Sequence, residues 1–283
     1  MIMDDIDRFL EEDIGSGDIT TETFVPDVDG RAVITCEDET VVAGLEEAAE
    51  VFRRLGVSAR PLTDDGTRVP RGTAVMELSG PERGITTAER TALNIMMRMS
   101  GIATMVNDAT LKLRKHNDRV MVAGTRKTTP GFRKFEKKAI VLGGGDPHRF
   151  GLYDMVLVKD NHIEAAGGIE NVMERCLDLP YGMKVEVEVE NAHDAEVAAK
   201  CGADIIMLDN RSPEEAKALY ALIKDIDENI IVEVSGRVTM DNIEDYADCA
   251  DRISMGAFTH SVKACHFSLA LIRNPQDGGP GRN

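Results

Sequence analysis

The chain has 283 residues, of which 42% are hydrophobic and 29% charged, and its formal net charge is −17. This length allows one large domain or two, and the apolar fraction is sufficient for a core. Nucleic acid is disfavoured as a partner, because the net charge repels a polyanion and a chain with 4% aromatic residues and no Trp lacks a stacking platform.

The N-terminal sequence and the cysteines favour a cytoplasmic protein. The start, MIMDDIDRFLEEDIG, has no basic region followed by an apolar one, so it is not typical of a secretory signal. No apolar run approaches the roughly 20 residues that span a bilayer. Five scattered cysteines without CxxC spacing argue against a disulfide or zinc framework and for a reducing compartment. The acidity is typical either of an ordinary soluble surface or of adaptation to salt.

Residues 1–105 are predicted to form an N-terminal domain. An amphipathic helix is expected over Met3–Glu12, with Ile6 and Phe9 on one side. The other elements expected are strands over Arg31–Thr35, Val41–Ala43 and Thr73–Leu78, and a helix over Leu45–Leu55 that ends at Gly56.

A longer helical pattern covers residues 86–115 at the end of this domain. Its apolar residues recur at helical spacing, and Thr87 is predicted to be its N-cap. Arg90 follows three residues later. Gly101 is expected to bend or break the helix.

From about residue 119, strand and helix patterns alternate, which is typical of βαβ units and a parallel sheet. Strands are predicted over Arg119–Ala123, Met155–Lys159, Lys184–Glu190, Asp204–Leu208, Asn229–Val234 and Arg252–Met255. Helices are predicted over Ile169–Leu177, Ala192–Cys201, Pro213–Asp225 and Met240–Cys249. Residues 106–262 are fewer than the roughly 250 of a complete eight-stranded barrel, so the expected fold class is α/β with an incomplete α/β barrel. The tail, 263–283, is expected to pack back on the N-terminal domain.

A polar side chain or a glycine stands at the carboxyl end of nearly every predicted strand. Because these ends converge in a barrel, the residues are expected to form one site. They are Arg126, Lys159, Glu188, Asp209, Ser235 and Gly256.

The sequence VEVEVE, residues 185–190, alternates with a period of two. This places its valines on one face of a strand and Glu186, Glu188 and Glu190 on the other. A carboxylate that points into a barrel is unfavourable unless it is paired. A solvated edge strand is the alternative interpretation.

The segment from Thr125 to His162 is cationic, with eight Lys and Arg residues against four Asp and Glu residues. Lys and Arg pair with carboxylate and phosphate, so the segment favours a small polyanion as ligand. In TRKTTPG, Arg126 offers a forked guanidinium and Lys127 a point charge. A basic turn held by surface ion pairs is the alternative.

Three further groups of residues in this half of the chain are candidates for ligand binding or catalysis. Gly143–Gly145 permits close approach of a ligand and precedes His148 and Arg149, for which a binding role is favoured over a structural one. Lys159 ends a buried-looking strand and is either an anion ligand or, when desolvated, a Schiff-base nucleophile.

The carboxyl ends of the later strands indicate a sugar-phosphate site. Glu188 and Asp209 are suited to Mg²⁺ or to ribose hydroxyls. Small residues before helix N-termini, at Ser235-Gly236 and in residues 254–257, favour a cradle of backbone N–H groups for phosphate, with tight packing as the alternative. Together, these features predict a phosphorylated sugar beside a small acid with several carboxylates.

Eight short motifs, in order across nearly the whole chain, resemble the quinolinate phosphoribosyltransferase family. The most specific are TRKTTPG at 125–131 and HRFGLYDMVLVKDNHI at 148–163. The others are GSGDIT at 15–20, ERTALN at 89–94, SGIAT at 100–104, EVEVEN at 186–191, LDN at 208–210 and SMGAFTHS at 254–261.

The resemblance implies a pentosyltransferase of de novo NAD synthesis. Its substrates would be quinolinate and phosphoribosyl pyrophosphate, with Mg²⁺, and its products nicotinate mononucleotide, pyrophosphate and CO₂. It also implies an N-terminal open α/β sandwich domain beside the incomplete barrel. The assembly implied is a homodimer, or a higher oligomer of dimers, in which one subunit's N-terminal domain covers its partner's barrel.

The resemblance also implies roles for individual residues. Arg126, Lys127, His148 and Arg149 would hold the quinolinate carboxylates, and Arg90 would reach in from the neighbouring subunit. Lys127 and Lys159 would face phosphate or pyrophosphate, and Glu188 and Asp209 would bind Mg²⁺ and the ribose. The loops with Ser235, Gly236, Gly256 and Ala257 would hold the 5′-phosphate, and the catalytic residues implied are Lys127, Lys159, Glu188 and Asp209.

Two departures from the family pattern stand out. Arg237 follows Ser235-Gly236 where the family usually has a second glycine, so it either adds a phosphate contact or blocks a backbone approach. Asp146-Pro147 stands where an Asn commonly precedes the His-Arg pair.

Other classes of protein stay open at this point. A nicotinate phosphoribosyltransferase shares the barrel but takes a monocarboxylate, and a molybdenum-transport-associated homologue shares the fold. A Schiff-base lyase would use Lys159, and a non-catalytic organic-anion binding protein would hold quinolinate without turnover.

Overall fold

The computed structural model describes residues 4–272 of the chain. Residue contacts divide the chain into two compact units. Unit 1 contains Met1–Thr104, Lys134–Gly143 and Val262–Asn283, and unit 2 contains Met105–Arg133 and Gly144–Ser261. No helix within the described span is long and apolar enough to cross a membrane.

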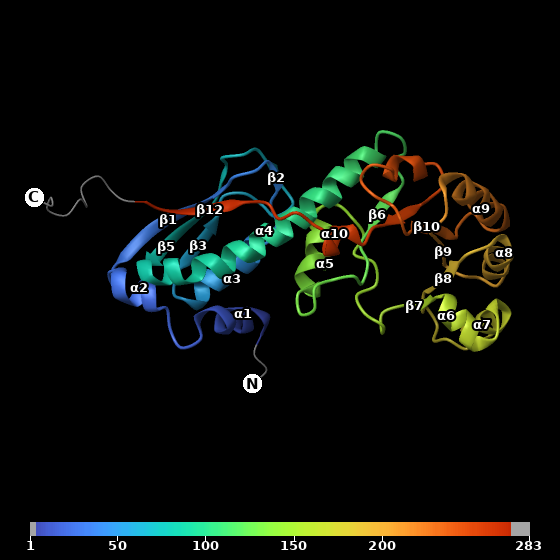
Figure 1. Cartoon of the computed structure of the whole chain (residues 1–283), viewed down its shortest axis with the longest axis horizontal. Helices are drawn as coiled ribbons and strands as arrows, with labels where there is room; N and C mark the ends of the chain where they lie inside the picture. The colour runs from blue at the N-terminus through green and yellow to red at the C-terminus, as the bar shows by residue number, and fades with distance from the viewer. Residues whose placement is uncertain (1–3, 273–283) are drawn as a thin grey trace, which may run out of the picture. The chain divides into compact units, whose positions relative to one another are not determined.

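Unit 1 is built on a four-stranded antiparallel sheet in the order β12-β1-β5-β3 (Figure 1). The strands are β1 (Asp29–Cys36), β3 (Ser58–Pro61), β5 (Ala74–Pro81) and β12 (Phe267–Ile272), and a separate two-stranded sheet joins β2 (Thr40–Val41) and β4 (Arg68–Val69). Alternate residues of β1, namely Ala32, Ile34 and Cys36, are fully buried, as expected for a strand with one face toward a core.

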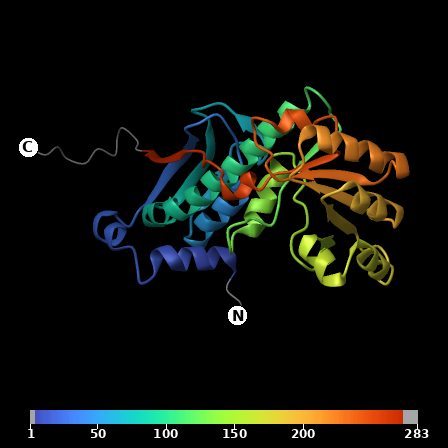
Figure 2. The same ribbon diagram turned by 45° about the vertical axis from the view of Figure 1, so that its right-hand side comes forward.

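Helices cover one face of this sheet, with α3 and α4 lying along it (Figures 1 and 2). The helices assigned wholly or mainly to this unit are α1 (Asp5–Ile14), α2 (Ile19–Phe24), α3 (Leu45–Arg54) and α5 (Arg133–Leu142), and α4 (Glu82–Leu113) begins here and ends in unit 2. Val51 and Phe52 of α3 and Met76 and Leu78 of β5 belong to the buried apolar core of the unit.

Two predictions about the long helix are wrong. The helix begins at Glu82, so Thr87 lies inside it, and its hydroxyl donates to Asp18 Oδ2 at 3.0 Å. Gly101 does not break the helix, which is continuous from Glu82 to Leu113. A Cβ added there would lie 2.4 Å from the carbonyl oxygen of Lys263, so the glycine allows the chain that enters β12 to pass against α4.

The contacts of α5 place it in unit 1, although its residues were expected in the barrel domain. Glu136 is fully buried and accepts from Arg98, and Lys138 pairs with Glu46 and Glu47 of α3. These are tertiary ion pairs between segments far apart in sequence, which helical periodicity alone does not report.

Unit 2 contains a six-stranded, all-parallel sheet in the order β6-β11-β10-β9-β8-β7. Its strands are β6 (Met121–Ala123), β7 (Val156–Val158), β8 (Val185–Val189), β9 (Ile205–Asp209), β10 (Ile231–Ser235) and β11 (Arg252–Ser254). Its helices are α6 (Asp160–Ala166), α7 (Ile169–Cys176), α8 (Ala192–Lys200), α9 (Pro213–Ile226) and α10 (Ala257–His260), with a 3₁₀ turn η1 (Ile243–Tyr246). The expected fold class, an incomplete α/β barrel with an N-terminal α/β domain, is confirmed.

The two faces of this sheet differ in chemistry. Helices α7, α8 and α9 cover the outer face, where registered residues such as Val187, Ile206 and Val232 are apolar (Figure 1). The opposite or inner face carries polar and charged residues, among them Glu186, Glu188, Asp209, Glu233, Ser235, Arg252 and Ser254. A polar inner face is what an active site at a barrel mouth requires.

Two expectations for unit 2 are corrected. Strand β8 lies between β7 and β9 with all five residues buried, so it is not a solvated edge strand. The helix expected over Met240–Cys249 is only the short turn η1. Asn242 accepts from the Thr239 N–H at 2.7 Å and donates to the Arg237 carbonyl, and such side-chain bonds compete with helical ones.

Candidate functional site

Most residues predicted for the site lie at one edge of the unit 2 sheet. Lys159 follows β7, Glu188 lies near the end of β8, Asp209 and Ser235 end β9 and β10, and Arg126 and Gly256 follow β6 and β11. All six strands are parallel, so these are the carboxyl ends, where loops of a barrel converge.

Glu188 and Lys159 form an ion pair at this edge. The carboxylate is largely buried, at 9% exposure for the residue, whereas the Lys159 side chain is 44% exposed. A cation that is accessible while anchored on a buried carboxylate can still meet an incoming anion.

Asp209 and Gly236 meet where the loops after β9 and β10 come together. A Cβ added at Gly236 would lie 2.8 Å from Asp209 Oδ1 and 2.4 Å from Asn210 Oδ1. Gly236 has a φ of +76°, and the Asn210 N–H donates to the Ser235 carbonyl at 2.9 Å. Glycine is therefore required both by the backbone conformation and by the space.

Lys127 and Gly256 also lie close together, at the point where the loops after β6 and β11 meet. A Cβ at Gly256 would lie 2.9 Å from Lys127 Cδ. The Thr259 hydroxyl donates to the Lys127 carbonyl at 2.7 Å, which fastens the loop after β6 to the segment after β11. Ala257 begins α10 directly beside this contact.

Arg126 and Arg149 act on each other electrostatically. Burial, followed by the positive charge of Arg126, lowers the pKa of the Arg149 guanidinium. Arg126 Nε is buried with no hydrogen-bond partner in the described part of the chain. Two mutually repelling guanidiniums and an unsatisfied buried donor are typical of a site for an anion with more than one carboxylate.

The ring of His148, predicted to contact substrate, is buried, and its Nε2 lies near two carboxylates without a hydrogen-bond partner among the described residues. Its Nε2 lies 3.1 Å from Glu186 Oε2 and 3.5 Å from Glu233 Oε2, and its Nδ1 accepts from the Arg149 N–H at 2.7 Å. The side chain is only 6% exposed. A direct bond from the ring to a substrate would require one of these contacts to open.

The carboxylates beside the ring change its tendency to hold a proton. Burial opposes a charged ring, but the neighbouring Glu186 and Glu233 carboxylates outweigh it and raise the pKa of His148 to about 9. Burial also raises the pKa of Glu186. The Arg149 N–H points at Nδ1, so when the ring is neutral Nδ1 is the acceptor and the ring proton is on Nε2, on the side of Glu186.

Glu233 and Arg252 belong to this inner-face group but were not predicted. The sequence carried a signal for Glu233, which is a single charged residue within the apolar strand pattern IVEVS, whereas Arg252 begins the predicted strand Arg252–Met255. The alternation that drew attention to VEVEVE applies equally to Glu233.

Two possible metal-binding sets can be compared among the described residues. His148, Glu186 and Glu233 offer ligand atoms within 4.8 Å of one another, but the Arg252 guanidinium pairs with both carboxylates. Glu188 and Asp209 supply hard oxygen donors at the open carboxyl edge, which fits Mg²⁺.

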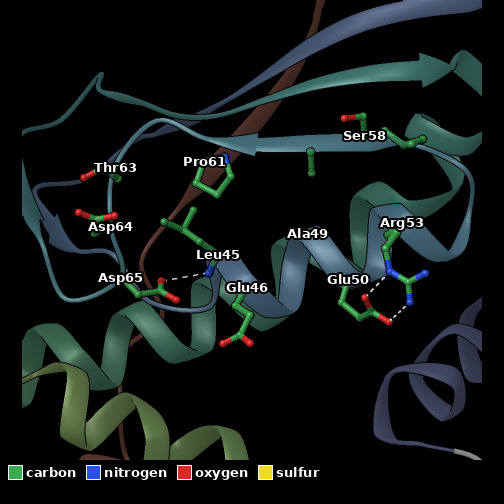
Figure 3. A pocket seen from close by; sticks show the side chains of 12 residues that line it. Leu45, Glu46, Ala49, Glu50, Arg53, Ser58, Pro61, Thr63, Asp64 and Asp65 are labelled. Carbon is green, nitrogen blue, oxygen red and sulfur yellow. Dashed lines mark hydrogen bonds and ion pairs between the residues drawn. The ribbon is translucent and has the colours of Figure 1, made fainter.

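Arg90 is not brought to this edge within unit 2, because it lies in the unit 1 part of α4, where it is exposed. A separate groove of about 550 Å³ lies between α3 and the edge strand β3 (Figure 3). Glu46, Glu50, Asp64 and Asp65 are among its lining residues, and none of the predicted site residues is.

The fold and the site together define an anion-binding α/β-barrel protein of the kind that handles sugar phosphates. Family models for quinolinate phosphoribosyl transferase match the chain, the N-terminal domain over residues 18–100 and the C-terminal domain over residues 102–270. The chain belongs to this family.

Curated relatives match over most of their length. A probable nicotinate-nucleotide pyrophosphorylase [carboxylating] from Methanothermobacter thermautotrophicus is 43% identical over 95% of this chain and 99% of its own. The human nicotinate-nucleotide pyrophosphorylase [carboxylating] is 37% identical, covering 86% of this chain and 82% of its own.

Solved structures are also similar to this chain in fold. The nicotinate-nucleotide pyrophosphorylase from Francisella tularensis matches with a TM-score of 0.89 at 36% identity, over 94% of each chain. Human nicotinic acid phosphoribosyltransferase matches with a TM-score of 0.57 at 12% identity, over 89% of this chain and 72% of its own, which is a likeness of fold alone.

Proposed function

We infer that this protein is a quinolinate phosphoribosyltransferase of NAD biosynthesis. It joins the phosphoribosyl group of phosphoribosyl pyrophosphate to quinolinate and releases pyrophosphate and CO₂, giving nicotinate mononucleotide. The observation that carries this inference is that Arg126 and Arg149 interact electrostatically, while Lys159, Glu188 and Asp209 lie at the carboxyl ends of neighbouring strands of the same unit. Two guanidiniums suit a dicarboxylate, whereas a monocarboxylate such as nicotinate needs only one.

We assign the acid-binding role to Arg126, Lys127 and Arg149, with His148 behind them. The unsatisfied Arg126 Nε supports this role, because a buried donor is stabilised by an acceptor that the ligand supplies. Arg90 is proposed to complete the acid site from a second subunit of a homodimer, or of a larger oligomer of dimers.

The phosphoribosyl side is assigned to the later strands. Ser235, Gly236, Gly256 and Ala257 would hold the 5′-phosphate through backbone N–H groups, since they lie at the carboxyl ends of β10 and β11. Lys127 and Lys159 would face the pyrophosphate.

The charges of these side chains match the charges that develop during the reaction. The ring nitrogen of quinolinate forms a bond to the anomeric carbon as the bond to pyrophosphate breaks, through a cation-like sugar. The Glu188 and Asp209 carboxylates stabilise that positive charge, and Lys127 and Lys159 stabilise the negative charge on the leaving oxygen. Loss of CO₂ leaves its electron pair at ring carbon 2, beside the cationic nitrogen, and a proton from solvent replaces it.

We propose Mg²⁺ as the cofactor, held by Glu188 and Asp209. Their carboxylate oxygens are the hard donors that it prefers. When bound, it would neutralise charge on the pyrophosphate. We also propose a cytoplasmic location, which the five free cysteines support.

The deciding experiment is release of CO₂ from carboxyl-labelled quinolinate with phosphoribosyl pyrophosphate and Mg²⁺, with nicotinate in a parallel reaction. CO₂ together with nicotinate mononucleotide is the expected result. Product from nicotinate alone would overturn the acid assignment. Binding of quinolinate without any turnover would identify a binding protein, and borohydride trapping of Lys159 would identify a Schiff-base lyase.

A further inference from the structure

A charged cluster lies on the inner face of the unit 2 sheet. It consists of Glu186 from β8, Glu233 from β10, Arg252 from β11, and Asp146 and His148 from the segment before β7. Arg252 Nη2 lies 3.4 Å from Glu186 Oε2, and its Nη1 donates to Asp146 Oδ2 at 3.1 Å. Arg252 Nε also donates to Glu233. One side chain thus joins three carboxylates.

This cluster is not explained by stability of the sheet. Both glutamate side chains are completely buried, and one oxygen of each, Oε1, has no hydrogen-bond partner among the described residues. Buried ion pairs commonly contribute no more to stability than apolar residues of the same volume, because desolvation opposes the attraction. The cluster therefore requires another explanation, which lies in the segment of chain that it holds in place.

The cluster holds the backbone at His148 and Arg149. His148 has a φ of +56°, a left-handed conformation that is unfavourable for a residue with a side chain. Its N–H donates to Asp146 Oδ1 at 2.6 Å, while its ring lies between the two glutamates and the Arg149 N–H. Each bond from the cluster fixes the turn that precedes the Arg149 side chain.

We propose that Glu186 and Glu233 are positioning residues that, through the His148 ring, fix the Arg149 backbone and so aim its guanidinium at the acid substrate. The proposal rests on the proposed function. It gives His148 the role of supporting Arg149 from the side away from the substrate. It also accounts for the left-handed backbone conformation of His148, next to Arg149. A bound metal ion is a poorer explanation, because Arg252 already supplies the positive charge between the carboxylates.

The first test is the Glu233→Gln variant, which keeps the volume of the side chain and removes its charge. Quinolinate affinity, measured by calorimetry without phosphoribosyl pyrophosphate, is expected to fall about 10-fold or more, as for other residues that orient ligand-contacting groups. Affinity for phosphoribosyl pyrophosphate is expected to stay within about 2-fold, because its contacts lie on other loops. Glu186→Gln should behave in the same way.

The matched control is Glu244→Gln. Glu244 also pairs with cations in unit 2, at 3.7 Å from Lys112 and 3.3 Å from His116, but it lies on η1 and away from the cluster. Both affinities should be unchanged. Equal loss of both ligands in Glu233→Gln, or no loss of either, would overturn the proposal.

A second measurement needs neither a folded variant nor turnover. Ring-nitrogen NMR of the wild-type protein, which has six histidines, is expected to find an unprotonated Nδ1 and a protonated Nε2 at His148 above pH 9, where the ring is neutral. Those signals should shift when quinolinate binds. A ring protonated on Nδ1, or signals that ignore bound quinolinate, would refute the positioning role. If the wild-type protein bound no quinolinate at all, the proposed function would fail, while the ring tautomer would still report on the network.

Discussion

In the proposed function, a few side chains of unit 2 supply the binding energy for the anionic substrates. Arg149 is the informative residue, because it is partly buried, is repelled by Arg126 and is held by the His148 turn. Burial and the charge of Arg126 disfavour its charged guanidinium, while the Glu186 and Asp154 carboxylates stabilise it.

Replacing Arg149 with Ala should therefore lower kcat/KM for quinolinate by about 10²–10³-fold, since loss of one member of a desolvated charge pair costs about 2–5 kcal/mol. Steady-state kinetics with each substrate varied in turn would measure this. Arg175→Ala, at an exposed position on α7, is the control and should retain activity. Unchanged efficiency in Arg149→Ala would remove this residue from the acid site.

The raised pKa of His148 predicts that the stability of the protein depends on pH. The groups facing the ring are Glu186, Glu233, Asp146, Arg149 and, through the carboxylates, Arg252. The folded-state pKa, about 9, lies above the ordinary value of 6.5. The stabilisation is accordingly complete below pH 6.5 and is lost as the pH rises through 9.

Wild-type protein should lose up to about 3 kcal/mol of its free energy of unfolding between pH 6.5 and 9.5 relative to His148→Gln. Urea unfolding of both proteins at several pH values would measure the difference. Parallel curves for the two proteins would show that His148 does not hold a proton of raised pKa.

At the scale of elements, two glycines determine how loops and helices fit. Gly236 permits contact between the loops after β9 and β10, and Gly101 permits contact between α4 and the chain that enters β12. In both cases a backbone or short polar group occupies the space that a Cβ would need.

Gly236→Ala should destabilise the protein and lower activity, because the added methyl meets Asn210 and Asp209. Gly202→Ala is a close control: its φ of +84° carries similar strain, but no atom lies within 4 Å of the added Cβ. Each change should cost about 1 kcal/mol for the backbone alone, with a further loss of about 1–3 kcal/mol at Gly236. Thermal unfolding and KM for phosphoribosyl pyrophosphate would separate them, and equal behaviour of the two variants would contradict the loop contact.

Gly101→Ala offers a test with opposed effects. Ala favours a helix over Gly by about 1 kcal/mol, yet the clash with the Lys263 carbonyl should cost more, so the variant should be less stable than wild type. Asn94→Ala, at an exposed position of the same helix, should be neutral or slightly stabilising. A gain of stability in Gly101→Ala would mean that the β12 segment can move away at little cost.

At the scale of the whole molecule, the open question is whether two chains share a site. Arg90 lies on exposed helix surface in unit 1, while the remaining proposed acid ligands lie in unit 2. A site shared between subunits predicts that Arg90→Ala and Lys159→Ala are each nearly inactive as pure proteins. After unfolding and refolding together, the mixture should recover part of the wild-type activity, because a mixed dimer contains one intact site. No recovery would indicate that Arg90 acts within its own chain or not at all.

The net charge of −17 permits one further prediction at this scale. If the acidic surface is an adaptation to salt, the melting temperature should rise steadily with KCl because screening reduces the repulsion. An ordinary soluble surface would give little change beyond low salt. Scanning calorimetry over a range of KCl concentrations distinguishes the two.

The sequence by itself determined the alternation of strands and helices, the fold class and the family. Period-two and helical patterns are local, and the polar residues that follow strands Met155–Lys159 and Asp204–Leu208 could be read directly from the chain. TRKTTPG and KDNH are specific enough to identify relatives without any geometry.

Only the tertiary structure decided which charges meet. Glu233 and Arg252 are 19 residues apart in sequence and register side by side on neighbouring strands, with Glu186 reaching the same guanidinium from β8. It also decided that His148 turns toward carboxylates, that Gly101 continues a helix, and that α5 joins unit 1. The physical reason is common to all four: each depends on the energy of a buried contact between distant segments, and local periodicity carries no information about that energy.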